Sequence, residues 1–305
     1  MTHWVDEDGK LRLGWRIVLG ILLVLAANFL AGAIANAAAN SQRSFEAVYR
    51  PTLLVLLLAW FSAMLLFADR TDANPLQALG LGRSRAFSDS LLGMLIGASC
   101  IGAGVATIAA FGGVSFSLRM NRHAAALLVV EVFILATGAM AEEIMFRGYP
   151  FQRILEGAGP AVAIFVLSVF FGIAHRWNPH AREVALLSFV NTIFVGVLLA
   201  FAYLRVRNLW LPWGVHFAWN GVLGVLFGLP VSGLNDFSVV VHGKATGPVW
   251  LTGGPYGIEG GLAGTLAILV GFFPIYWFTR RRPSGVAPDP GSATTALGLL
   301  AGPRS

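Results

Sequence analysis

The sequence predicts an all-α membrane protein with about eight transmembrane helices, and three observations point to this fold class. Of its 305 residues, 56% are hydrophobic and only 12% are charged, whereas soluble domains carry about 25% charged residues. The mean hydropathy is +0.72. The apolar residues are also gathered into separate stretches, each approaching the ~20 residues that a helix needs to cross a bilayer. We therefore expect a polytopic integral membrane protein.

Eight apolar stretches are expected to form the transmembrane helices. They are residues 15–38, 51–68, 88–111, 124–149, 159–176, 184–204, 209–227 and 261–279. The first follows an N-terminus without a small-residue cleavage site, so we interpret it as an uncleaved helix and not as a signal peptide. Between the second and third stretches we expect a short interfacial helix, with Leu76, Leu79 and Leu81 facing lipid.

Charge predicts the orientation of these helices. The formal net charge is +6, but the basic residues are spread one to three per loop, so we expect no nucleic-acid partner. With the N-terminus inside and the C-terminal tail left aside, thirteen Lys and Arg residues fall in inner segments and seven in outer loops. Cytoplasmic loops carry the excess of Lys and Arg. The bias therefore predicts that both termini are cytoplasmic.

Two adjacent glutamates, Glu142 and Glu143, follow directly on the apolar stretch 124–141. Carboxylates near hydrocarbon are costly and are usually paired or functional. Glu143 shares a helix face with Arg147, four residues on, in the favoured order for an ion pair. Glu142 points about 100° away and has no partner on its own helix. We expect a structural pair and a free base or ligand; the alternative is that both glutamates are structural.

His175 is predicted to lie beside Glu142. A Gly-Ala-Gly-Pro break separates the fourth and fifth stretches, and Glu142 lies sixteen residues before Ala158 while Ala174 lies sixteen residues after it. Because the helical rise is equal on both arms of a hairpin, Glu142 and Ala174 should be level. Taken alone, His175 would be read as an interfacial histidine as readily as a functional one.

His216 and Asn220 form a third polar intrusion, on the seventh stretch. They are four residues apart and so share one helix face. Histidine binds metals or relays protons, and asparagine can donate to a developing oxyanion. The alternative for both is hydrogen bonding between membrane helices. Glu131 lies nearly on the Glu142 face; no role is assigned to it, and a hydrogen bond to Asn191 or Thr192 is one structural possibility.

Two chemistries suit this set of residues. Glu142, His175 and His216 are a suitable ligand set for one divalent metal, zinc, with an open position for water. The soluble zinc-protease motif H-E-x-x-H is absent. Without a metal, Glu142 and His175 could activate a water directly. The sequence leaves both possibilities open, and we favour the metal.

Three short motifs occur in order on successive apolar stretches. They are Glu142-Glu143-x-x-x-Arg147-Gly148-Tyr149, Phe171-x-x-x-His175 and His216-x-x-x-Asn220. Over roughly residues 120–225 the chain resembles the CAAX prenyl endopeptidase and bacteriocin-processing (CPBP) family of intramembrane proteases, also called the abortive-infection (Abi) family. Each motif alone is weak, but the three in order are fairly specific.

The resemblance implies an intramembrane endopeptidase with a conical cavity open toward the cytoplasm. Glu142 would activate the attacking water with help from His175. His216 and Asn220 would stabilise the oxyanion or hold a metal or water, and Glu143 with Arg147 would order the site. The expected partners are the lipid bilayer and a membrane-associated protein or peptide substrate, and the expected location is a bacterial cytoplasmic membrane. The resemblance does not imply that this protein cleaves its substrate after a prenylated cysteine.

The apolar stretches, together with the resemblance over the core, divide the chain into four expected regions. They are residues 1–120 with helices one to three and the interfacial segment, 121–227 with the catalytic core of helices four to seven, 228–282 with a long loop and the last helix, and 283–305 as a disordered tail. No role is predicted for the loop at 228–260.

Two other functions compete with the protease. One is a non-proteolytic membrane protein of the same fold, acting in peptide immunity or as a chaperone. The other is a proton-coupled transporter that uses Glu131, Glu142 and the histidines as a relay. A transporter should show paired half-repeats or broken helices at the midplane, and the sequence shows neither.

Overall fold

The computed structural model describes residues 4–6, 11–68, 75–119, 122–235 and 237–281. Most of these residues are helical, and they include one two-stranded sheet. The prediction of an all-α polytopic membrane protein is confirmed. The predicted tail at 283–305 lies outside the described residues.

The elements follow one another along the chain in a nearly unbroken series of helices. The α-helices are α1 (Leu13–Ala38), α2 (Gln42–Ala63), α3 (Pro75–Ala78), α4 (Ala86–Phe111), α5 (Ala124–Arg147), α6 (Tyr149–Ala174), α7 (Ala185–Val206), α8 (Trp210–Gly221), α9 (Val249–Thr252) and α10 (Leu262–Thr279). Short π or 3₁₀ turns are η1 (Met64–Ala68), η2 (His175–Trp177), η3 (Val222–Leu226), η4 (Gly254–Tyr256) and η5 (Ile258–Gly260). The strands are β1 (Val114–Leu118) and β2 (Val241–Ala245).

Six helical runs within the described residues are long and apolar enough to cross a membrane. One of them, Ala124–Trp177, is 54 residues long and holds both the fourth and the fifth predicted stretches. Seven of the eight predicted stretches therefore correspond to these runs. The remaining one, 209–227, is shorter as a helix than expected, because α8 ends at Gly221 and continues only as the π-helical turn η3.

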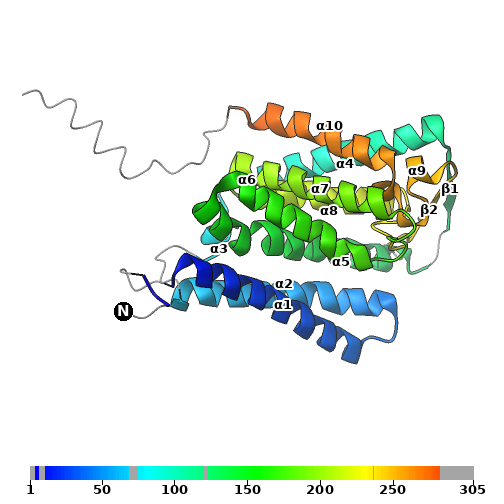
Figure 1. The fold of residues 1–305 in the computed structure, drawn as a ribbon. Helices are drawn as coiled ribbons and strands as arrows, with labels where there is room; N and C mark the ends of the chain where they lie inside the picture. The colour runs from blue at the N-terminus through cyan, green and yellow to red at the C-terminus, as the bar shows by residue number, and fades with distance from the viewer. Residues whose placement is uncertain (1–3, 7–10, 69–74, 120–121, 236, 282–305) are drawn as a thin grey trace, which may run out of the picture.

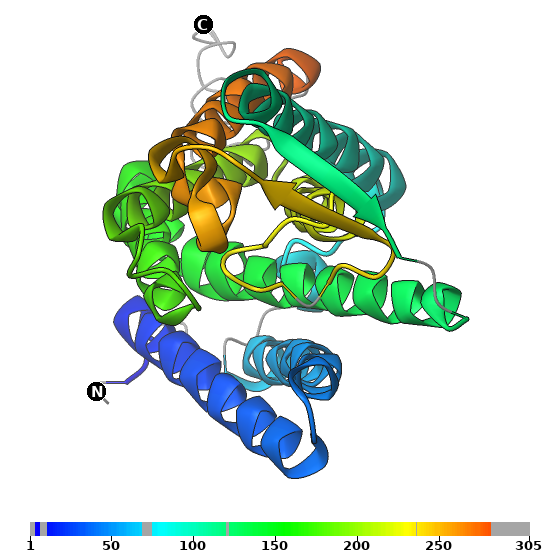
Figure 2. The same cartoon turned by 90° about the vertical axis from the view of Figure 1, so that its right-hand side faces the viewer.

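The bundle has two distinct ends. In Figure 1, α1 begins and α10 ends on the left, whereas β1, β2 and α9 lie on the right. We call these the termini end and the sheet end. The antiparallel pair α1 and α2 forms a layer of its own beside the remaining helices, and α2 packs on α5 (Figures 1 and 2).

Helices α4 and α8 approach each other closely through two glycines of α4. A Cβ atom on Gly93 would come 2.3 Å from the carbonyl oxygen of Leu211, and one on Gly97 would come 2.3 Å from that of Val215. Only glycine allows the two backbones to approach this closely. The contact holds α8, which carries His216 and Asn220, firmly in the bundle.

The turn between α5 and α6 supports the predicted hairpin. The helix breaks first at Gly148, but the chain does not reverse there. Met145 contacts Asn28, Tyr149 contacts Gly20 and Gly157 contacts Leu13, so the segment keeps the direction of α5 and runs antiparallel to α1. It reverses at Gly159, whose φ of 81° suits glycine and which precedes Pro160. The reversal is thus adjacent to the predicted pivot at Ala158.

Two features differ from the sequence prediction. The sheet was not expected: β1 pairs antiparallel with β2, from Val114 with Ala245 to Leu118 with Val241. It brings the long loop back over the connection between α4 and α5. The expectation that Leu79 and Leu81 face lipid is wrong, because they are 0% and 8% exposed. Their segment is docked on the start of α8, where the Leu209 amide donates to the Gly80 carbonyl oxygen at 2.8 Å.

Candidate active site

A cavity of about 310 Å³ lies between the helices in the half of the bundle nearer the sheet end. It contains the four residues predicted to be catalytic, which come from α5, the end of α6 and α8. These are Glu142, His175, His216 and Asn220. The prediction that the polar residues of separate apolar segments meet in one buried place therefore agrees with the structure.

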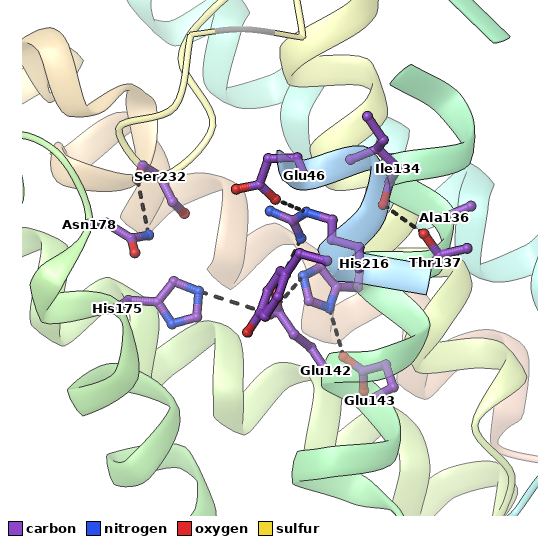
Figure 3. Close-up of polar contacts among 12 residues, drawn as sticks. Glu46, Ile134, Ala136, Thr137, Glu142, Glu143, His175, Asn178, His216 and Ser232 are labelled. Atoms are coloured by element: carbon purple, nitrogen blue, oxygen red, sulfur yellow. Dashed lines mark hydrogen bonds and ion pairs between the residues drawn. The ribbon is translucent and has the colours of Figure 1, made fainter. Parts of the chain in front are cut away.

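Glu142 lies between the two histidines (Figure 3). Its Oε2 atom is 3.7 Å from Nε2 of His216 and 4.0 Å from Nε2 of His175. Among the described residues, this buried oxygen makes no hydrogen bond. The level match of Glu142 and His175, expected from the hairpin, is thus found in the structure.

The far side of each imidazole ring is held by an acceptor. Nδ1 of His175 is 2.8 Å from the carbonyl oxygen of Phe171, and Nδ1 of His216 is 2.8 Å from Oε1 of Glu143. A carbonyl and a carboxylate only accept hydrogen bonds, so each Nδ1 carries the proton. When a ring is neutral, its Nε2 lone pair therefore faces Glu142. With both rings neutral, three acceptor atoms face one another, an arrangement that a donor such as a water would satisfy.

Glu143 and Arg147 form the buried pair expected from their spacing. Nη1 of Arg147 lies 3.3 Å from Oε1 of Glu143, and the side chains are 2% and 0% exposed, respectively. Arg147 also donates from Nη2 to the Gly196 carbonyl oxygen at 3.0 Å. Because Glu143 also binds His216, the pair connects α5, α7 and α8. This is the geometry of residues that order a site.

Asn220 is 9% exposed and lines the cavity one helical turn after His216. Asn220 and Glu142 therefore line the same cavity. Sequence reasoning placed His216 and Asn220 on one face, and the cavity lies on that face.

Sequence reasoning missed Arg50 and Glu46, which line the cavity from α2. Nη1 of Arg50 lies 3.7 Å from Oε1 of Glu142, and its Nε lies 2.6 Å from Oε2 of Glu46. Glu142 has no partner on its own helix, as expected, but has one on α2. The available signal was the i,i+4 spacing of Glu46 and Arg50. It was overlooked because the second helix was expected to begin at residue 51, whereas α2 begins at Gln42.

The long loop also contributes to the cavity wall. Glu259 accepts hydrogen bonds from Nε1 of Trp219 at 2.9 Å and from the amide and hydroxyl groups of Ser232. Beside it, burial raises the pKa of the Tyr256 hydroxyl above its usual value, and the charge of Glu259 adds to this. The loop between α8 and α10 is therefore tied to the site by a buried carboxylate.

The suggested hydrogen bond between Glu131 and Asn191 is not the arrangement found. Glu131 pairs with Arg43, whose Nε is 2.6 Å from Oε1. Asn191 instead donates to the carbonyl oxygens of Glu259 and Gly261, each at 2.9 Å. Glu131 thus connects α5 to α2, and Asn191 connects α7 to the segment before α10.

Glu142, His175 and His216 are the residues expected to bind a metal. Within the described parts of the chain, no three His, Cys, Asp or Glu side chains form a group that could hold a metal ion as they stand. The side chains of Glu142, His175 and His216 therefore do not fit a zinc site in this arrangement. The zinc ion remains a prediction for metal analysis.

The cavity lies at the opposite end of the bundle from the start of α1 and the end of α10. Its lining includes Glu46 near the start of α2, Asn178 after α6 and Ser232 after α8, all toward the sheet end. The two expectations of cytoplasmic termini and of a cavity open to the cytoplasm therefore cannot both hold.

The apolar helices and the buried polar cavity define an integral membrane protein with a site inside its helical bundle. Residues 124–222, about a third of the chain, match the family described as Type II CAAX prenyl endopeptidase Rce1-like. This confirms the family resemblance, and the matched segment contains all six predicted site residues. The family supports a protease. No curated protein and no solved structure matches the chain.

Proposed function

We propose that the protein is an intramembrane endopeptidase that hydrolyses a peptide bond of a membrane-associated protein or peptide. The observation that carries this proposal is the buried Oε2 atom of Glu142, which has no hydrogen-bond donor and faces Nε2 of both histidines. A water placed there would donate one hydrogen to Glu142 and the other to a histidine. That is the position of a nucleophile between a general base and a second acceptor.

The proposed reaction follows from these positions. Glu142 takes one proton from the water as the water oxygen attacks the carbonyl carbon of the substrate. His175 accepts a hydrogen bond from the remaining O–H, which stays on that oxygen, and so orients the water. The resulting oxyanion accepts a hydrogen bond from the Asn220 amide. Glu142 then returns the proton to the leaving nitrogen as the C–N bond breaks.

In this proposal His216 also stabilises the oxyanion. In its protonated form, Nε2 donates to the oxyanion, and the carboxylate of Glu143, 2.8 Å from Nδ1, stabilises the positive ring. Arg147 in turn holds Glu143 in place. No step requires a metal ion, and elemental analysis of active protein tests the zinc expectation.

The orientation is also a proposal. Thirteen basic residues against seven favour both termini in the cytoplasm. The protein would then lie in a bacterial cytoplasmic membrane, with its sheet end and cavity toward the outside. This choice sets aside the cytoplasm-facing cavity, because the charge bias is a property of this chain and the cavity direction was taken from the resemblance.

The test compares new N-termini of membrane proteins in cells that carry the wild type or Glu142→Gln. Glu156→Gln is the matched control, because Glu156 is an exposed partner of Arg153 away from the cavity. We expect a set of N-termini that wild type and control generate and Glu142→Gln does not. Purified protein in vesicles should then cut a peptide that spans one of these sites. Identical sets for all three would overturn the proposal and favour a non-proteolytic role, in peptide immunity or as a chaperone.

A further inference from the structure

The helix pair α1 and α2 lies outside the segment that matches the family, yet it supplies one wall of the cavity. On this wall, Arg50 stands between two carboxylates. Its Nε is 2.6 Å from Oε2 of Glu46 and its Nη1 is 3.7 Å from Oε1 of Glu142. Charged groups in membrane helices are usually paired and functional.

The two oxygens of Glu142 have different surroundings. Oε1 lies toward Arg50, whereas Oε2 lies toward the two histidines. Because a carboxylate is planar, a cation on one oxygen limits the rotation that would carry the other away. Arg50 also donates from Nε to Glu46. The orientation of the guanidinium is therefore fixed by a contact that does not involve Glu142.

Gly138 makes room for this arrangement. It lies one turn before Glu142 on α5, and a Cβ atom there would come 2.3 Å from Nη1 and 2.6 Å from Cδ of Arg50. These atoms belong to the end of a long flexible side chain. An alanine at this position would therefore move the guanidinium and leave the helix intact.

We propose that Arg50 is a positioning residue, which acts on the water-activating oxygen of Glu142 through the other oxygen. This rests on the proposed protease function. It makes the α1–α2 pair a necessary part of the active site, although the family match begins only at residue 124.

The catalytic arm of the test uses purified protein in vesicles and an internally quenched peptide that spans a cleavage site found for the wild type. Arg50→Gln should lower kcat by about 10- to 100-fold with little change in KM, since misplaced groups cost about this much. Arg50→Lys keeps the charge and should recover part of the loss. Gly138→Ala should lower kcat in the wild type but add nothing in the Arg50→Gln protein, because no guanidinium remains to be moved. Gly102→Ala is the matched control, since no atom outside its own helix turn lies within 4 Å of that Cβ position.

A second arm does not depend on activity. Thermal unfolding in detergent is measured for Arg50→Gln, Glu142→Gln and the double variant, and the two effects should be non-additive if the side chains interact. Additive effects would overturn the proposed pairing. Non-additive unfolding with unchanged kcat in Arg50→Gln would overturn the positioning role. If the wild type cleaves nothing, the protease proposal fails, and the unfolding cycle alone decides whether Arg50 holds Glu142.

Discussion

Nδ1 of His216 lies 2.8 Å from Oε1 of Glu143, the same oxygen that lies 3.3 Å from Arg147. One buried carboxylate oxygen thus joins the imidazole of α8 to the guanidinium of α5. Sequence spacing predicted the second contact and not the first. The consequence is that Glu143 both neutralises a buried cation and fixes which nitrogen of His216 faces Glu142.

Glu143→Gln should destabilise the fold as well as lower activity. The substitution leaves Arg147 as a buried charge without its ionic partner, and removing one member of a buried pair costs about 3–5 kcal/mol. Thermal unfolding in detergent measures the effect. Glu156→Gln is again the control, because an exposed pair contributes less than about 1 kcal/mol. A Glu143→Gln protein as stable as this control would contradict the structural role.

Glu142→Gln should remove activity and retain the fold. The amide keeps the shape of the side chain but cannot take a proton from water, and loss of a general base costs about 10²- to 10⁴-fold. Arg50 keeps its contact with Glu46, so the site loses one charge without losing all of its pairing. Cleavage of the quenched peptide and the thermal midpoint should be measured on the same preparation. Residual activity within tenfold of wild type, against the about 10²-fold minimum expected for a lost base, would exclude Glu142 as the base.

Metal analysis of active protein separates the two chemistries. If Glu142, His175 and His216 rearrange to bind zinc, active protein should hold about one zinc per chain, and chelation should abolish activity that zinc restores. The acceptor geometry described above favours a water, so we expect no stoichiometric metal in fully active protein. One bound ion per active chain, lost in the His175→Ala and His216→Ala variants, would show that expectation to be wrong.

Cysteine accessibility tests the orientation. In a Cys100→Ala background, Thr246→Cys places a thiol at the exposed sheet end and Ser84→Cys places one at the exposed termini end. With cytoplasmic termini, a membrane-impermeant maleimide should label Thr246→Cys in intact cells and Ser84→Cys only after permeabilisation. The reverse pattern would place the cavity toward the cytoplasm and the termini outside.

The loop carboxylate offers a separate test of the cavity wall. Glu259→Gln weakens the hydrogen bonds from Trp219 and Ser232, and bonds to a charged group contribute about 1.5–3 kcal/mol. We expect lower thermal stability and a higher KM, because the wall of the cavity loosens. Ser88→Ala, which removes an exposed hydroxyl, should leave both values unchanged. If Glu259→Gln behaves like this control, the loop does not depend on its buried carboxylate.

The sequence by itself determined the membrane class, most of the helices and the convergence of the polar residues. These follow from local rules: about 20 apolar residues cross a bilayer, and residues four apart share a helix face. The hairpin between Glu142 and His175 belongs with them, because equal helical rise on two arms needs only a pivot, which the glycines near Ala158 mark.

The tertiary structure alone decided which residues from other segments complete the site. Arg50 reaches Glu142 from α2, and Glu259 reaches Trp219 from the long loop; β1 and β2 pair across more than a hundred residues of chain. These contacts depend on how helices pack, and packing is set by close backbone approaches such as that of Gly93 to Leu211. No periodicity along a single helix encodes them. The tertiary structure alone also decided at which end of the bundle the cavity lies. The depth of a cavity and the side on which it lies depend on the relative positions of all the helices around it.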